Sequence, residues 1–120
     1  MTAALYSIER AAIEAIIRQH SRLSDALIVQ LGEATATNRR RTGTGFYTDL
    51  HISDHAPLVI TASPIGKLFA DVEGLEHGMG FLLWFANGKM KCLEGFSFEE
   101  PTTLIEFEVV VFSIIGCELI

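Results

Sequence analysis

The sequence predicts an α+β fold in which one or two N-terminal helices pack on a curved antiparallel sheet of five or six strands. Two observations carry this prediction. A helical apolar pattern occupies the start of the chain, and the remainder consists of short apolar or alternating runs separated by turn residues. Helical patterns do not separate those runs, as a parallel sheet would require, so strand neighbours are expected to be mostly sequential. The 120 residues are expected to form one domain, 1–120.

The segment Ala4–His20 has the periodicity of an amphipathic helix. Its apolar residues recur at intervals of three and four, and its charged residues fall largely on the opposite side. The apolar set is Leu5, Ile8, Ala12, Ile13, Ile16 and Ile17, and the charged set is Glu9, Arg10, Glu14 and Arg18. The helix therefore offers one apolar stripe to the sheet or to a partner.

The next segment, Ser21–Leu31, fits two structures. Three leucines at four-residue spacing favour a second short helix, with Gly32 as its C-terminal stop. The run Ala26–Val29 would equally suit the start of a strand. We favour the helix for residues 22–31.

Strands are expected over the rest of the chain. The clearest is 46–52, where Phe46, Thr48, Leu50 and Ile52 alternate with Tyr47, Asp49 and His51. The other expected strands are 34–39, 58–61, 67–72, the two arms of a hairpin within 77–98, and 103–115. Glycines at 43 and 45, Ser63-Pro64 and Glu99-Glu100-Pro101 supply the turns.

The hairpin is the strongest local prediction, because Asn87-Gly88 between two apolar runs suits a two-residue type I′ turn. That turn would pair Leu83 with Cys92 and Phe81 with Glu94. One face would then be apolar, comprising Met79, Phe81, Leu83, Phe85, Met90, Cys92 and Phe96. This register predicts a core surface that has Glu94 within it.

Glu94 is the one candidate catalytic residue. A carboxylate among apolar side chains would have its pKa raised by desolvation, as in catalytic acids and bases. The alternatives are a β-bulge at Gly95 that turns Glu94 out to solvent, or a sheet edge that is open to water. We favour these alternatives.

The second hairpin face would place Trp84 opposite Lys91, Leu82 opposite Leu93 and Gly80 opposite Gly95. Trp84 and Lys91 could make a cation–π contact there, and Trp84 is a candidate ligand-binding residue. A half-apolar face of this kind is also a candidate for dimer contact.

A polar cluster follows the alternating strand. Asp49, His51 and His55 are suitable ligand types for zinc or another first-row metal. Residues four apart on an extended strand lie about 13 Å apart, so the chain would have to fold His55 back. We favour ordinary strand-end and turn roles for all three.

The only basic run is Arg39-Arg40-Arg41, before the glycine turn. Arg39 and Arg41 are candidate ligand-binding residues for a phosphate or carboxylate, because guanidinium groups bind such anions. Strand alternation sends Arg40 to the opposite face. We favour a solvated strand end.

Composition excludes several function classes. The net charge of −6 argues against a nucleic-acid partner, and no apolar run approaches the ~18 residues of a membrane span. The charged N-terminal segment is unlike a signal peptide. Cys92 and Cys117 are far apart in sequence, which favours buried free thiols in a reducing cytosol. No cofactor is expected.

Two segments, Thr42–Thr48 (TGTGFYT) and Leu93–Phe98 (LEGFSF), resemble a group of small bacterial proteins with T-G-x-G-F-[FY]-T and L-E-G-[FY] motifs. The similarity runs from about Leu31 to Pro101 and does not include the apolar C-terminal tail. The resemblance implies a bacterial cytosolic protein. It implies no activity and no catalytic residue.

These observations predict a non-enzymatic interaction protein that forms a homodimer through an apolar sheet face. The first alternative is a small enzyme or ligand-binding protein with a pocket between helix and sheet around Glu94. The second is a metal-binding protein that uses Asp49, His51 and His55.

Overall fold

A computed structural model describes residues 2–117 of the chain. Its elements are α1 (Ser7–Arg18), α2 (Ser24–Glu33), β1 (Thr35–Arg41), β2 (Gly45–His51), β3 (Ile65–Val72), β4 (Met79–Ala86), β5 (Lys89–Ser97) and β6 (Phe112–Cys117). The strands form one antiparallel sheet in the order β1-β2-β5-β4-β3-β6. The predicted α+β class and the second helix are confirmed, although α2 continues through Gly32 to Glu33.

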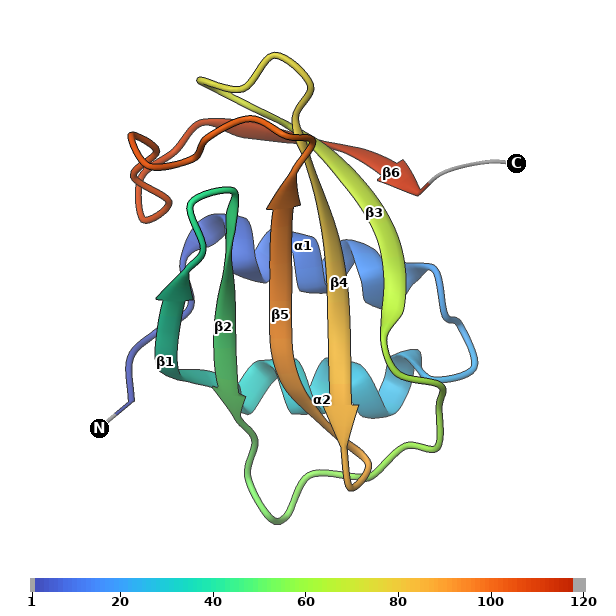
Figure 1. Ribbon diagram of the computed structural model, residues 1–120. Coiled ribbons are helices and arrows are strands. Elements are labelled where there is room, and N and C mark those ends of the chain that lie inside the picture. The colour runs from blue at the N-terminus through green and yellow to red at the C-terminus, as the bar shows by residue number, and fades with distance from the viewer. Residues whose placement is uncertain (1, 118–120) are drawn as a thin grey trace.

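The molecule has two layers, because both helices lie on the same face of the sheet (Figure 1). Its extents of 39 × 39 × 19 Å are those of a slab. Neither helix is long and apolar enough to cross a membrane.

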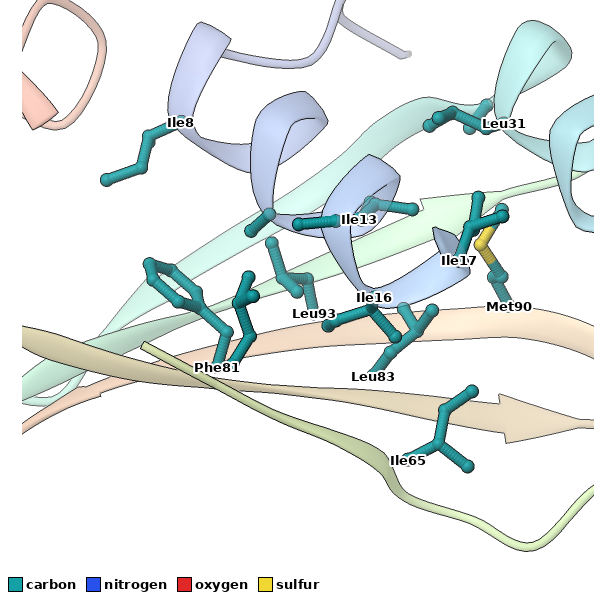
Figure 2. Packing of buried hydrophobic residues seen from close by; sticks show 14 of the residues in the cluster. Ile8, Ile13, Ile16, Ile17, Leu31, Ile65, Phe81, Leu83, Met90 and Leu93 are labelled. Atoms are coloured by element: carbon teal, nitrogen blue, oxygen red, sulfur yellow. The ribbon is translucent and has the colours of Figure 1, made fainter. Parts of the chain in front are cut away.

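The core lies between α1 and the sheet. Isoleucines of α1 at three- and four-residue spacing are buried, including Ile13 and Ile16. Figure 2 shows Ile16 lying over Leu83 of β4 and Leu93 of β5. Burying each large aliphatic side chain stabilises the fold by about 1.5–3 kcal/mol before conformational entropy is subtracted.

Two predicted strands are wrong. Residues 58–61 form no strand, and Ile60 is 99% exposed. Pro57 and Pro64 bracket this run, and its Val59 N–H bonds only the Gly88 carbonyl at the hairpin tip. Residues 103–111 are turns and irregular backbone, so the last strand begins only at Phe112. Phe107 inserts into the core from this irregular segment, and the contact holds the segment across the end of the sheet.

The hairpin register differs from the predicted one by a single β-bulge. The turn pairs Ala86 with Lys89 and Phe85 with Met90 as expected, but Trp84 then pairs with Cys92, which leaves Lys91 unpaired in the bulge. Each later residue of β5 therefore faces the side opposite to the predicted one.

The prediction that Glu94 lies on the core face is wrong for this reason. Leu93 and Gly95 face the helices instead, and Cys92, Glu94 and Phe96 face away from them. A bulge was one of the alternatives, but it lies at Lys91 and not at Gly95.

Candidate functional site

The sheet face that the helices leave uncovered is rich in aromatic side chains. We call this surface the open face; Figure 1 views the sheet from this side, with both helices behind it. Its aromatic and aliphatic members are Tyr47, Phe69, Leu82, Trp84, Phe96 and Phe98. Trp84 and Phe98 are 37% and 39% exposed, which is high for such large apolar side chains.

Glu94 lies near the middle of the open face, on the central strand β5. Its carboxylate accepts hydrogen bonds from the Trp84 indole Nε1 at 3.0 Å and from the Tyr47 hydroxyl at 3.3 Å. The negative charge of Glu94, followed by burial, raises the pKa of Tyr47. Glu94 is therefore a fixed surface carboxylate flanked by two aromatic rings, and it belongs to no pocket between helix and sheet.

Arg40 continues this polar row toward the edge of the sheet. Its guanidinium lies 5.0 Å from the centre of the Tyr47 ring and pairs with the Asp49 carboxylate at 2.9 Å. The side chains of both partners remain substantially exposed, so this pair contributes little to stability.

A row of aromatic rings lies beside Glu94. The ring of Phe96 covers Gly80 on the neighbouring strand, where a Cβ atom would lie only 2.5 Å from the ring. The Phe98 ring contacts both Phe96 and Phe69, with centroids 5.7 and 5.9 Å away. Gly80 therefore pairs with Phe96 and not with Gly95 as predicted.

A second surface lies at one end of the two layers, where the segment between β5 and β6 crosses near the β1–β2 turn (Figure 1). We call it the end pocket; it is lined by Tyr6, Glu9, Arg39, Arg41, Phe46, Thr48, Phe107 and Glu108. Its volume is about 190 Å³.

Glu9 of α1 is the buried ion of this pocket, with 1% of its surface exposed. It accepts hydrogen bonds from Arg39 Nε at 2.9 Å, from Arg39 Nη2 at 2.7 Å, from the Tyr6 N–H at 2.6 Å and from the Thr48 hydroxyl. The hydrogen bonds to Glu9 raise the pKa of Arg39 above its usual value. The Arg39 guanidinium also stacks on the Tyr6 ring at 3.5 Å.

Placing Glu9 on the outer side of the helix was therefore wrong. The missed signal is its spacing, because Glu9, Ile13 and Ile16 stand at i, i+4 and i+7 and so share one helix face. Arg39 and Arg41 share the end pocket while Arg40 lies on the open face, as strand alternation predicts.

The candidate metal ligands are not assembled. Asp49 pairs with Arg40, while His51 ends β2 and His55 lies in the following turn, both exposed. In the part of the chain that the structure describes, no group of three or more His, Cys, Asp or Glu side chains could hold a metal ion.

Cys92 is free and 7% exposed, and it lies on the open face beside Trp84, not in the core as predicted. Burial, reinforced by the charge of Asp49, raises the pKa of its thiol to about 11. The side chain of Cys117 lies outside the described part of the structure.

We expect the Cys92 thiol to be unreactive in the folded protein. At pH 8 only about one thiol in a thousand would be ionised, and the thiolate is the nucleophile. In a Cys117→Ser background, iodoacetamide should alkylate Cys92 at least about tenfold more slowly in buffer than in denaturing urea. Equal rates in the two solvents would contradict the structural assignment.

No protein-family model, curated protein or solved structure matches this chain. The architecture is that of a two-layer α+β protein with an uncovered sheet face, and the end pocket lies at one end of its layers. The resemblance to small bacterial proteins stays a prediction.

Proposed function

We propose that the protein is a non-enzymatic interaction protein that forms a homodimer by stacking two open faces. The observation that carries the proposal is that helices cover only one face of a six-stranded sheet, while the other face presents Trp84, Phe96, Phe98 and their neighbours. Exposed apolar surface of this extent is typical of protein interfaces. Tyr and Trp are the residue types that most often dominate binding energy there.

The size of the open face supports a dimer. The five gaps between six strands, at about 4.8 Å each, span about 24 Å, and about eight residues at 3.3 Å rise span about 26 Å, so the sheet covers roughly 600 Å². Two such faces would bury about 1,200 Å², the lower limit of a standard specific interface. The contact therefore suits a dimer with a micromolar dissociation constant better than a permanent one.

The charges on β5 also suit a second copy of the chain. Lys91 is exposed in the bulge of β5, three residues before Glu94 on the same strand. In a two-fold interface, residue i of one copy meets residue j of the other, and j meets i. Lys91 of each copy would then pair with Glu94 of its partner.

We expect the purified protein to sediment as a dimer at about 100 µM and to dissociate on dilution. Trp84→Ser and Lys91→Glu should each weaken dimerisation about tenfold or more, while the matched control Ile60→Ser should not. Ile60 is 99% exposed and lies in a loop outside the sheet. Sedimentation equilibrium measures all four proteins.

A charge reversal tests the geometry directly. The double variant Lys91→Glu/Glu94→Lys should restore part of the affinity that Lys91→Glu alone removes, because the reciprocal pair is re-formed with opposite sign. A wild-type protein that stays monomeric at 100 µM would refute the proposal. Equal weakening of dimerisation by Ile60→Ser would show that the interface lies elsewhere.

We propose a reducing bacterial cytosol as the location. The resemblance of the Thr42–Thr48 and Leu93–Phe98 segments favours it, and so does a buried cysteine that remains a free thiol.

A further inference from the structure

The end pocket holds two arginines, of which Arg39 is half-buried and Arg41 is exposed. Arg39 and Arg41 stand two residues apart on β1, so their side chains emerge on the same side of the strand about 7 Å apart. Each guanidinium is stacked on an aromatic ring, Arg39 on Tyr6 at 3.5 Å and Arg41 on Phe107 at 4.9 Å. Stacking restricts these long side chains before any ligand arrives, and that lowers the entropy cost of binding.

The two arginines differ in how their charge is matched. The charge of Arg39 is neutralised by the bidentate contact with Glu9. Arg41 donates from Nη2 to the main-chain carbonyl of Thr102, which is a neutral acceptor. Within residues 2–117, Arg41 makes no ion pair, and the rest of its five N–H donors have no protein acceptor. Arg41 therefore brings an unmatched positive charge and unused donors to the pocket.

The other lining residues define the shape of a ligand. Phe46 and Phe107 form an apolar wall, with ring centroids 4.7 Å apart. The pocket volume of about 190 Å³ equals the liquid volume of about six waters. That space suits a carboxylate with a short aliphatic or single aromatic body, and it is too small for a nucleotide.

We propose that the end pocket binds a small monocarboxylate, with the carboxylate on the free donors of Arg41 and the apolar body against Phe46 and Phe107. An Arg–carboxylate contact is charge-assisted and can be bidentate, which fixes the ligand's orientation as well as adding affinity. The pocket lies on the helix side of the sheet and the proposed dimer interface on the opposite side. The two proposals can therefore fail separately.

Glu108 should weaken the binding of an anion in the end pocket. It lines the rim of the pocket and is exposed, and its charge acts on Arg39. A carboxylate at the rim repels an incoming anion, so Glu108→Gln should tighten binding by about two- to fivefold at low salt.

Benzoate is the probe, with benzamide as its uncharged isostere. In an NMR titration of the wild-type chain, benzoate should bind with a dissociation constant of about 1 mM or tighter and shift the amides of Arg41 and Phe107. Benzamide should bind at least about tenfold more weakly, since it cannot pair with the guanidinium charge. This comparison needs no variant and is unaffected by any loss of folding.

The matched variants are Arg41→Gln and Arg40→Gln, which remove the same charge from opposite faces of one strand. Arg41→Gln should weaken benzoate binding about tenfold or more, and Arg40→Gln should change it less than about twofold. Three results would overturn the proposal: no saturable binding of acetate, butyrate or benzoate at 10 mM or below, equal binding of benzoate and benzamide, or equal loss in the two variants.

Discussion

Truncation of Glu9 to alanine should lower the free energy of unfolding by about 3–5 kcal/mol. Glu9 is almost fully buried, and the substitution leaves the Arg39 guanidinium, the Thr48 hydroxyl and the Tyr6 N–H without their shared acceptor. A loss of this size is a large part of the about 5–15 kcal/mol that stabilises a typical domain. Urea unfolding measures the loss.

Glu14→Ala is the matched control, because Glu14 belongs to the same helix and is exposed. Its effect should stay within about 0.5 kcal/mol. The double variant Glu9→Met/Arg39→Met should recover most of the stability, since it removes both charges together. If Glu9→Ala cost no more than Glu14→Ala, the ion pair would have no structural role.

Gln30→Leu should lower the free energy of unfolding by about 2–4 kcal/mol. The Gln30 side chain is fully buried on α2 and bonds three backbone groups at the hairpin tip and in the preceding loop. Its Oε1 accepts from the Met90 N–H at 2.9 Å, and its Nε2 donates to the carbonyls of Pro57 at 2.8 Å and Gly88 at 2.9 Å. Leucine has a similar size but removes the partner of the Met90 N–H and of the Pro57 carbonyl, while the Gly88 carbonyl keeps its bond from the Val59 N–H.

Hydrogen exchange adds a local measurement. The Met90 amide should exchange faster in Gln30→Leu than the loss of global stability alone explains, because that N–H loses its acceptor. Gln19→Leu, at the end of α1, is the control and should be close to neutral. Unchanged Met90 protection in Gln30→Leu would contradict the role assigned to the glutamine.

Local patterns were enough to predict the layers of the fold. The isoleucine spacing of the first helix and the alternation of residues 46–52 report directly on which side chains are buried. The alternation of Arg39, Arg40 and Arg41 predicted their faces for the same reason. These features depend only on the geometry of one element.

The errors arose where burial depends on residues that are distant in sequence. The bulge at Lys91 could not be placed from alternation alone. Met90, Cys92 and Leu93 are all apolar, so both possible registers place apolar side chains on the core face. Glu9 can be buried because its carboxylate is paired with Arg39, which lies 30 positions away along the chain. The strand predicted at 103–115 failed because Phe107 joins the core from an irregular segment, which a hydrophobic run does not distinguish from a strand.

The alternation of β1 connects the two proposed binding surfaces. Arg40 touches Tyr47 and Asp49 on the open face, while its neighbours Arg39 and Arg41 line the end pocket. A ligand in the pocket and a second copy on the open face would therefore contact opposite sides of the same edge strand. Thermodynamic linkage is reciprocal: the factor by which the ligand changes the dimerisation constant equals the factor by which dimerisation changes the affinity for the ligand. The dimerisation constant measured with and without benzoate would give that factor.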